Sequence, residues 1–564
     1  MNEKLSGNYI SEIKFNTGKI ISINKNDIVV FVGPNNAGKS QSLSDIYNLS
    51  YNKTNSIVIS NITIQKNFDE IQSILQNISP SRKDNNYTYY NVMGNNFSIY
   101  DQTNNIFSNN YGYGDFRNLI IANLNTTNRL SICYPAHNII RSESKVNPIH
   151  YAAFNKKYRD WISINFKKAF GEGIIPDINF GNQIPLRIGS PINLGDNQKF
   201  RDELERQDKF IEIINNYEQV HEQGDGIKSF TGILLYLMLD YFKIYLIDEP
   251  ESFLHPPQAR IIGQIIGETL SNNQQAFLST HSEEIIKGLL DTCPERLKII
   301  RITREGNKNE FSILDNTKIG NITNDALLKY SNILSAMFYK SVVLCESDSD
   351  CKMYSIIENY EKQIKGKFAE TLFIHCGGKH RMSKVISALK DLNINITVIP
   401  DMDIMNDKNT FINITTACGI SWENIEKDYN IIVSNLHSQK ENIDRKNFKD
   451  IVNRILDEKN TKNLSNTEIE NIQKELKISS KWNNIKLYGE QGIPAGDGIT
   501  AFENMNKTLK ENKIFMVPVG EIENFIRDVG NHGPEWVNRV LEKHPNLGDC
   551  VYNDIKNFIN EMNL

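Results

Sequence analysis

The chain has 564 residues, of which 39% are hydrophobic and 23% are charged, and its formal net charge at pH 7 is −5. This length is enough for two to four domains that each bury a core. The mildly acidic balance excludes a basic surface over the whole molecule, so contact with nucleic acid has to be local or mediated by cations. Seven cysteines without a CxxC pair argue against a zinc ribbon or a disulfide framework and favour a cytoplasmic location. The most apolar stretch, residues 230–247, is interrupted by two charges and is too short to span a membrane.

Regular elements are expected at the start of the chain. Strands are predicted at residues 9–15, 20–23 and 28–32, and the last is a continuous apolar run that suits a strand buried in a sheet. A glycine loop and a predicted helix at 41–47 follow. The Asn- and Tyr-rich range of about 50–220 is predicted to be an insertion and a candidate dimerisation region, with a helical part at 149–170.

Strands and helices alternate from residue 230 onwards, which predicts an α/β sheet with a ligand site at the carboxyl edge of its strands. Predicted helices are 231–241, 257–270 and 283–290, and predicted strands are 243–247, 275–279, 298–302 and 310–314. After a helical join at 325–335, a second α/β set has predicted strands 341–345, 371–375, 396–400 and 514–518. We therefore expect one domain over 1–335 and another over 336–564, the second with a helical insertion at about 407–497.

The loop after the third strand has the spacing of a Walker phosphate loop, Gly33-Pro34-Asn35-Asn36-Ala37-Gly38-Lys39-Ser40. Its backbone N–H groups, with a helix N-terminus behind them, can surround phosphate oxygens. In this motif Lys39 reaches the β- and γ-phosphates of ATP, and the Ser40 hydroxyl ligates Mg²⁺. An ordinary glycine turn is the competing interpretation, and the preceding strand and following helix count against it. The predicted nucleotide-binding residues are Gly33, Asn35, Asn36, Gly38, Lys39, Ser40 and Gln41.

Two later strand ends carry residues suited to nucleotide hydrolysis. The apolar strand 243–247 leads into Asp248-Glu249, which predicts Asp248 beside Mg²⁺ and Glu249 polarising the attacking water. His281, after strand 275–279, can sense the γ-phosphate. In this order the motifs resemble those of ABC-type ATPases of the SMC/RecF kind, whose sites are completed by a signature loop of the partner subunit. The resemblance implies at least a homodimer and makes Gly226 the expected contact, although 224–229 departs from the usual Leu-Ser-Gly-Gly form.

A second set of acids lies at strand ends in the C-terminal half. Glu346 and Asp350 follow strand 341–345, and Asp401 and Asp403, which follow the strand at 396–400, lie on the same side of the chain. Carboxylates gathered this closely repel one another unless divalent cations lie between them, which predicts Mg²⁺ or Mn²⁺. Two such cations can activate water and stabilise the leaving oxygen of a phosphodiester. Solvated loops are the competing interpretation.

The Glu…Asp-x-Asp pattern and the glycine turn at 376–380 resemble a Toprim domain. An ABC-type ATPase followed by Toprim resembles the OLD (overcoming lysogenisation defect) family of nucleases, which includes effectors of Gabija and some retron defence systems. The resemblance covers nearly the whole chain, most strongly at the motifs. It implies a later acid, Glu523 or else Glu521, and a lysine, for which Lys543 is the candidate and a solvated helix face the competing interpretation. Lys379 and His380 are candidates for contact with DNA phosphate.

Together the motifs predict an ATP-regulated, divalent-metal-dependent DNA endonuclease that acts in antiviral defence. The expected cofactors are ATP and Mg²⁺ or Mn²⁺ at both sites. The expected partners are DNA, further copies of the chain, and either a second defence protein or a retron reverse transcriptase with its RNA–DNA. One alternative is an ATP-dependent DNA clamp or sensor with a non-cutting Toprim domain. Another is a topoisomerase-like strand transferase with Tyr354 or Tyr360 as nucleophile.

Overall fold

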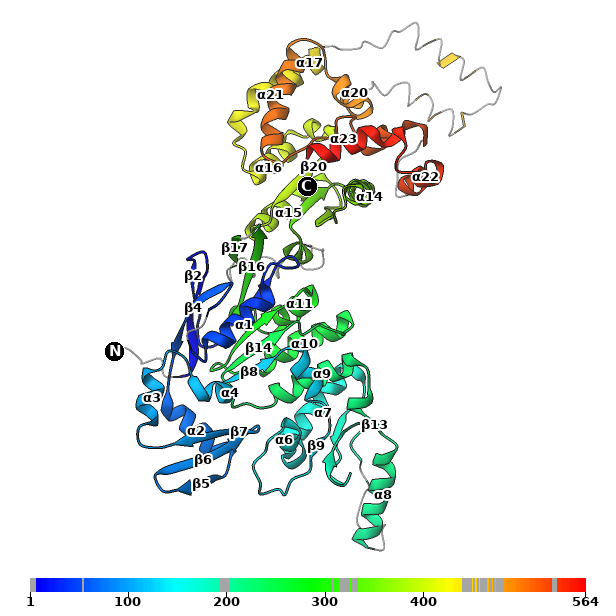
Figure 1. Ribbon diagram of the computed structural model, residues 1–564. Coiled ribbons are helices and arrows are strands. Elements are labelled where there is room, and N and C mark those ends of the chain that lie inside the picture. The colour runs from blue at the N-terminus through cyan, green and yellow to red at the C-terminus, as the bar shows by residue number, and fades with distance from the viewer. Residues whose placement is uncertain are drawn as a thin grey trace. The chain divides into compact units, whose positions relative to one another are not determined.

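The structure is a computed structural model that describes residues 7–52, 55–192, 202–306, 308–314, 333–438, 481–529 and 535–563, together with isolated positions elsewhere. The chain forms two compact units, Met1–Lys329 and Tyr330–Leu564. Each is built of mixed strands and helices (Figure 1), as the sequence predicts. The helical join predicted at 325–335 lies largely outside the described residues.

A six-stranded sheet forms the centre of the first unit. Its strands lie in the order β17 (Lys308–Leu314), β16 (Leu297–Glu305), β3 (Ile28–Val32), β15 (Gln275–Ser279), β14 (Ile244–Asp248) and β8 (Ile121–Leu124). All neighbours are parallel except β16 and β17. Because parallel strands share one carboxyl edge, the loops after β3, β14 and β15 are neighbours there. Every residue of β3 and β15 is buried, which explains the continuous apolar run in β3.

Five helices follow or flank the loops at the carboxyl edge of this sheet. α1 (Lys39–Leu49) begins within the glycine loop and packs against β3, β14 and β15. α9 (Asp225–Leu237) contacts α5 (Thr126–Ser131), which follows β8. α10 (Pro256–Thr269) and α11 (Glu283–Thr292) pack against each other. The helix expected at 231–241 therefore begins and ends earlier than its apolar pattern predicts.

The range 50–220 is only partly an insertion, because β8 within it is an edge strand of the central sheet. Two of the antiparallel sheets outside the central one are β2 (Ile20–Ser22), β1 (Tyr9–Phe15) and β4 (Ile59–Gln65), and β5 (Ser81–Asp84), β6 (Tyr87–Val92) and β7 (Asn95–Ile99). The helix expected at 149–170 is two helices, α6 (Pro148–Phe154) and α7 (Lys156–Phe170). They separate at Asn155, whose extended backbone and side chain cap α7.

The remaining elements of this range are short helices and strands. They are α2 (Phe68–Ile78), α3 (Thr103–Asn109), α4 (Arg117–Ile120), β9 (Ala136–His137), β10 (Ile174–Pro176), β11 (Gln183–Ile184), β12 (Leu186–Ile188), α8 (Glu203–Asn215) and β13 (Glu218–Gln219). Strands β10, β12 and β13 form one small sheet, and β9 and β11 form another.

The second unit contains a parallel three-stranded sheet in the order β19 (Thr371–His375), β18 (Ser341–Cys345) and β20 (Ile396–Ile399). α14 (Asp348–Ile364) follows β18, and α15 (Lys379–Asp391) follows β19. This is the alternation that the sequence predicts. Cys345 lies opposite Ile399, so the chain leaves β18 and β20 at adjacent points of the carboxyl edge.

The prediction of a regular strand at 514–518 is wrong. The segment runs beside β20 with a single parallel bridge between Val398 and Ile514. Val517 N donates to Pro400 O over 3.1 Å. Pro400 and Pro518 have no N–H to donate, so a regular ladder cannot continue past them. The segment nevertheless brings Gly520 beside the acids that follow β20.

Helices complete the second unit. They are α16 (Lys408–Cys418), α17 (Glu426–Ser438), α20 (Lys481–Tyr488), α21 (Asp497–Glu511), α22 (Trp536–Lys543) and α23 (Asn553–Glu561). Tyr354, Trp536 and Phe558, from α14, α22 and α23, share one core. Within the predicted insertion at 407–497, residues 439–480 lie outside the described residues except for isolated positions.

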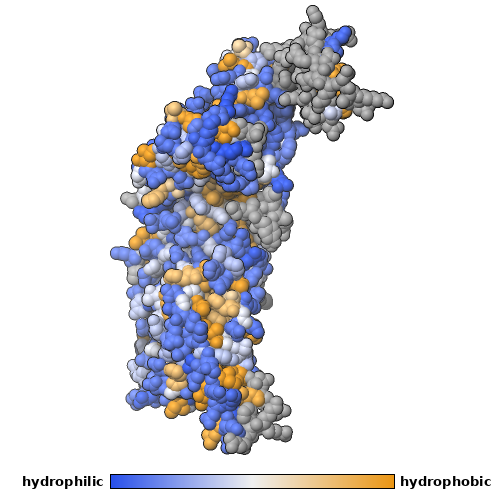
Figure 2. Space-filling view, turned by 90° about the vertical axis from the view of Figure 1, so that its right-hand side faces the viewer, coloured by the Kyte–Doolittle hydropathy of each residue, from blue (hydrophilic) through white to orange (hydrophobic). Residues whose placement is uncertain are grey.

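Hydrophilic residues cover most of the molecular face in Figure 2, with hydrophobic residues scattered among them. Large apolar side chains such as Phe31, Tyr245 and Phe277 are instead fully buried in the central sheet, where removal of apolar surface from water stabilises the fold. Among the helices that the structure describes, none combines the length and apolarity needed to cross a membrane.

Candidate functional site

A cavity of about 720 Å³ lies over the glycine loop. It is lined by Asn16, Asn35, Asn36, Ala37, Gly38, Lys39, Ser40, Gln41, Ile57, Val58, Glu249, His281, Arg304 and Asn309. The cavity therefore joins the phosphate-loop residues to two residues, Glu249 and His281, predicted from distant strand ends. Of the other predicted nucleotide-site residues, Gly33, Asp248 and Gly226 are not part of its lining.

Lys39 provides the cation of the loop. Its side chain is buried, and Nζ donates to the carbonyl oxygens of Gly33 (3.0 Å) and Pro34 (2.8 Å). Burial lowers the pKa of Lys39 to about 8, although nearby carboxylates, Glu249 first among them, act in the opposite direction. Phosphate oxygens would be stronger partners for this ammonium than the two carbonyls.

The loop is fixed by backbone geometry and by the sheet. Gly33 and Gly38 have φ values of 143° and 102°, which side chains rarely permit. A Cβ on Gly33 would collide with the carbonyl oxygen of Ile302 on β16. On the other side, Asn309 Nδ2 of β17 donates to Ala37 O over 2.8 Å. These contacts hold the loop open around the cavity.

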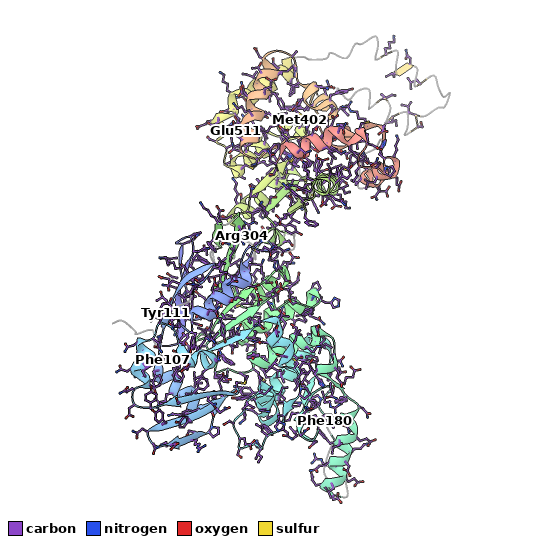
Figure 3. The ribbon with its side chains drawn as sticks, viewed as in Figure 1. Phe107, Tyr111, Phe180, Arg304, Met402 and Glu511 are labelled. Atoms are coloured by element: carbon purple, nitrogen blue, oxygen red, sulfur yellow. The ribbon has the colours of Figure 1, made fainter. Side chains whose placement is uncertain are left out.

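Five lining residues lie outside the sequence motifs: Asn16, Ile57, Val58, Arg304 and Asn309. Asn309 is 272 positions from the loop carbonyl that it bonds. Asn16 Nδ2 donates to Ile57 O over 2.8 Å and so joins the end of β1 to the cavity wall. Arg304, labelled in Figure 3, lies near the end of β16. Only the tertiary structure could identify these residues. The order of the central sheet sets β16 and β17 beside the glycine loop, and Asn16 reaches the cavity from the end of β1 in a separate sheet.

The acidic end of β14 faces the same cavity. Asp248 accepts a hydrogen bond from the hydroxyl of Ser279, the residue opposite it on β15. Glu249 has a left-handed backbone, with φ of 45°. Its Oε1 lies 3.7 Å from His281 Nε2. Burial lowers the pKa of His281, and the charge of Lys39 acts in the same direction, so the imidazole is neutral near pH 7.

Gly226 has a packing role in this structure. It lies in the first turn of α9, and a Cβ there would meet the carbonyl oxygen of Phe253 at 2.6 Å. Beside it, Asp225 and Lys228 form an ion pair of 2.8 Å. The glycine thus allows α9 to approach the loop after β14, and its predicted contact with a partner subunit stays a prediction.

The acids of the second unit lie around the carboxyl edge of its sheet. Glu346 follows β18 directly, and Asp401 follows β20 after Pro400. Met402 N donates to Gly520 O over 3.0 Å, which brings Glu521 alongside. Asp350 lies in the first turn of α14, where it forms a capping box with Ser347. The irregular segment after Ile514 thus brings Glu521, the second choice for the later acid after Glu523, beside Asp401, and the role of either acid as a ligand stays a prediction.

The electrostatics show that these carboxylates crowd one another. Burial and the charge of Asp403 raise the pKa of Glu346 to about 7. Burial and the charges of Glu346 and Asp350 hold the pKa of Asp401 well above its usual range. Burial also raises the pKa of Asp350, and the charge of Glu523 adds to this. The protein therefore holds these acids where a bound cation would relieve their repulsion.

Whether a divalent cation fits this site depends on the carboxylate oxygens of these acids. Glu346 Oε1 is buried and has no hydrogen-bond partner, and carboxylate oxygens are the ligands that Mg²⁺ and Mn²⁺ prefer. The side chains are not gathered around one point, however. Across the residues that the structure describes, no group of three or more His, Cys, Asp or Glu side chains is positioned to hold a metal ion. Asp403 and Glu521 instead pair with lysines.

Two lysines enter the acidic cluster, and Lys543 is not one of them. Lys379 Nζ lies 3.0 Å from Asp403 Oδ1, and Lys486 Nζ lies 3.3 Å from Glu521 Oε2. The Nζ of Lys543 pairs with Asp528 at 3.0 Å on the surface of α22. Lys379, predicted with His380 as a candidate for contact with DNA phosphate, begins α15 and lies beside the acids, and its contact with DNA stays a prediction.

Of the two tyrosines predicted as possible nucleophiles, Tyr354 is not suited to attack DNA. Tyr354 is fully buried in the core between α14 and α23. Burial holds its pKa well above the usual range, so the phenol stays protonated. Tyr360 lies against the Lys556 ammonium, 5.0 Å from the ring centroid. The strand-transferase alternative therefore loses its nucleophile at Tyr354.

Two family models match the chain. Residues 28–287 match the model described as "AAA domain, putative AbiEii toxin, Type IV TA system". Residues 337–403 match "Overcoming lysogenization defect protein-like, TOPRIM domain". The chain has the domain pair of an OLD-family ATPase–Toprim fusion. The first match runs from β3 into α11, and the second begins before β18 and ends at Asp403. Together they contain the glycine loop, the acidic end of β14, and the acids that follow β18 and β20.

Solved structures that match the chain include SMC head domains. A SmcHead bound to the C-winged helix domain of ScpA has 13% identity and a TM-score of 0.35, over 55% of this chain and 99% of that one. A Smc head domain derived from Pyrococcus furiosus has 12% identity and a TM-score of 0.31, over 56% and 99%. The head domain from Thermotoga maritima has 14% identity and a TM-score of 0.28, over 55% and 98%. No curated protein matches the sequence.

Proposed function

We propose that this OLD-type fusion is an ATP-regulated DNA endonuclease that depends on Mg²⁺ or Mn²⁺. The observation that carries the proposal is the acidic edge of the Toprim sheet. Glu346 and Asp401 follow adjacent parallel strands, and their pKa values are raised first by burial and then by the charges of neighbouring carboxylates. Such an arrangement suits hard cations, which can activate water and neutralise the leaving oxygen of a phosphodiester.

The proposed ligands are Glu346, Asp350, Asp401 and Asp403, with Glu521 or Glu523 as the later acid. Asp403 and Glu521 would exchange their lysine partners for metal, and this rearrangement would bring the side chains together. Lys379, whose Nζ lies 3.0 Å from Asp403 Oδ1 in this structure, would then be available to bind the scissile phosphate or stabilise its developing charge. Lys379 therefore replaces Lys543 in our proposal for the catalytic lysine.

At the nucleotide site, we assign ATP to the cavity over the glycine loop. Lys39 would bind the β- and γ-phosphates, and Ser40 and Asp248 would ligate Mg²⁺. Glu249 would accept a proton from the attacking water, and the neutral His281 beside it would contact the γ-phosphate. The left-handed backbone of Glu249 supports this assignment, because strained conformations concentrate at functional sites.

Nucleotide is proposed to act as a gate. Hydrolysis of a phosphodiester is already favourable, so ATP is not needed to drive cutting. Binding of ATP between α9 of one subunit and the glycine loop of another would set the geometry of a homodimer and thereby control the Toprim site. The packing of α9 against the loop after β14 supports a mechanical link within one subunit.

A role as an antiviral effector in the cytoplasm is proposed on the strength of the domain pair. All seven cysteines are free thiols, and five of them are buried, which is the state expected of a reducing compartment. The proposed partners are DNA and either a second defence protein or a retron reverse transcriptase with its RNA–DNA. Co-purification of the tagged chain from infected cells would test these partners.

Cleavage of supercoiled plasmid tests the central proposal. The purified chain is incubated with Mg²⁺ or Mn²⁺, with and without ATP, beside Asp401→Ala and Asp348→Asn. Asp348 is a suitable control because it lies near the site but is exposed and paired with Lys352. Metal-dependent nicking or linearisation that only Asp401→Ala removes would support the nuclease, and the ATP lanes would give the sign of the gate. Cleavage retained by Asp401→Ala would refute the assigned metal site.

A second candidate is an ATP-dependent clamp that holds DNA without cutting it. In its favour, the described side chains do not converge into a set of three or more metal ligands. A clamp would bind DNA in an ATP-dependent way and leave plasmid intact with either metal. Its activity in cells would also survive Asp401→Ala, whereas a nuclease would lose activity.

A further inference from the structure

A buried arginine lies directly behind the acidic end of β14. Arg129, on α5, is 0% exposed. Its Nη2 donates to the carbonyl oxygen of Glu249 over 3.0 Å, and its Nη1 donates to Leu124 O over 3.2 Å and also to Asp248 O. One guanidinium group thus joins the ends of β8 and β14, and it does so at the two residues to which ATP hydrolysis is assigned.

The contacts fix a strained peptide. The φ of Glu249, 45°, is uncommon for a residue with a side chain and persists only when surrounding contacts impose it. Its N–H donates to Ser279 O over 2.9 Å, and its carbonyl oxygen accepts from Arg129. The direction of the Glu249 carboxylate, which meets His281 and the hydroxyl of Ser252, follows from this backbone.

Charge gives a second reason for an arginine at this position. Burial lowers the pKa of Arg129, but the charges of Asp248, Glu251 and Glu249 oppose that effect. Carbonyl oxygens accept from both terminal nitrogens of Arg129, Nη1 and Nη2, whereas its buried Nε has no hydrogen-bond partner among the described residues. The planar fork of a guanidinium can reach several carbonyls at once, whereas a lysine ammonium at the end of a single stem cannot.

The arginine also lies next to α9. A Cβ on Gly232 of α9 would collide with the backbone oxygen of Arg129. One turn further on, Cys133 Sγ donates to Lys228 O over 3.1 Å. α5 is therefore in backbone contact with α9, the helix whose first turn carries the proposed contact to a partner subunit, and a shift of α9 would move the guanidinium.

We propose that Arg129 is the positioning residue for Glu249 in ATP hydrolysis and connects that residue to α9. The inference rests on the proposed function, in which Glu249 takes a proton from water as the water oxygen bonds to the γ-phosphorus and the bond to the β-phosphate oxygen breaks. Arg129 makes no bond to nucleotide in this scheme. It holds the peptide that aims the carboxylate.

The test compares Arg129→Lys with Arg296→Lys in the full chain. Arg296 is also buried, and it donates to the carbonyl oxygens of Asn26, Leu270, Ser271 and Gln274 at the opposite end of the sheet. Both changes keep the charge and remove the fork. We expect kcat for ATP hydrolysis to fall about 10- to 100-fold in Arg129→Lys and to stay within about twofold in the control, while ATP affinity is unchanged in both.

A double variant separates positioning from general stability. In a Glu249→Gln background, Arg129→Lys is expected to cause no further fall in kcat, because residues that act as a unit are not additive. If the loss of kcat in the double variant equals the product of the losses in the two single variants, the proposal is overturned. Should Arg129→Lys not fold, Arg129→Gln, which keeps one amide donor, is measured in the same way.

Other results of these measurements would overturn the positioning role of Arg129, the assignment of Glu249, or both. Equal losses of kcat in the two arginine variants, or parallel losses of kcat and ATP affinity in Arg129→Lys, would show a structural role only and overturn the proposal. If the wild type hydrolyses ATP and Arg129→Lys has the same kcat, the positioning role of Arg129 is overturned, but the assignment of Glu249 is not. A wild-type chain that binds ATP but does not hydrolyse it, with its DNA present, would overturn the assignment of Glu249 as well.

Discussion

Glu346→Gln is expected to make the metal-free protein more stable at high pH while it abolishes metal binding at the Toprim site. In the folded chain the pKa of Glu346 rises from 4.5 to about 7. At about 1.36 kcal/mol per pKa unit, this rise corresponds to a cost of about 3 kcal/mol for keeping the ionised carboxylate in place. Glutamine has nearly the same volume and carries no charge, so it removes that cost.

The direction of the pKa shift of Glu346 sets the pH range in which the wild type and Glu346→Gln differ in stability. Below pH 4.5 the acid is protonated in both folded and unfolded chains, and the substitution changes little. Between pH 4.5 and about 7 the unfolded chain loses its proton while the folded chain keeps it, so wild-type stability falls as pH rises. Above about pH 7 the full cost is present, and Glu346→Gln is expected to exceed the wild type by up to about 3 kcal/mol.

Urea unfolding of the Toprim unit at pH 5 and pH 8 provides the assay, with EDTA or with Mg²⁺. Mg²⁺ is expected to raise the stability of the wild type at pH 8 and to leave Glu346→Gln unchanged, because only the former retains the ligand. Asp348→Asn is the control, since its exposed carboxylate pairs with Lys352. If Glu346→Gln is less stable than the wild type at pH 8 in EDTA, burial and the neighbouring carboxylates do not destabilise the ionised Glu346 as inferred.

Other substitutions test the two sites separately. Lys379→Ala is expected to slow plasmid cleavage about 100-fold, because its ammonium meets Asp403, while Lys543→Ala stays near the wild-type rate; the opposite ranking would return the catalytic role to Lys543. Asn309→Ala removes a buried hydrogen bond to the glycine loop, worth about 1–2 kcal/mol. A fluorescent ATP analogue should therefore bind about tenfold more weakly, and equal affinity would exclude Asn309 from loop positioning. Gly33→Ala should abolish that binding in a protein that still folds, because its Cβ collides with β16; retained binding would contradict the fixed loop.

Much of the architecture follows from local patterns. The apolar run of β3 and the loop after it predict a buried parallel strand feeding a phosphate site, since a strand covered on both faces needs no polar alternation. Glu346 and Asp401 are likewise predicted from acids that follow apolar strands, because such residues emerge at one edge of a parallel sheet. The errors lie where prolines interrupt a pattern, as at Pro400 and Pro518, or where an asparagine cap divides a helix, as at Asn155.

Long-range neighbours are decided only by the tertiary structure. Asn309 is set beside the glycine loop by the order of β17, β16 and β3. Lys379 reaches Asp403 because α15 begins at the sheet edge where β20 ends. Arg129 had no motif to identify it, and it becomes meaningful only where β8 pairs with β14. Sequence patterns report which residues leave a strand or start a helix, because that is local chemistry. Which distant side chain satisfies a buried carbonyl or carboxylate depends on sheet order, which the global packing of the chain sets.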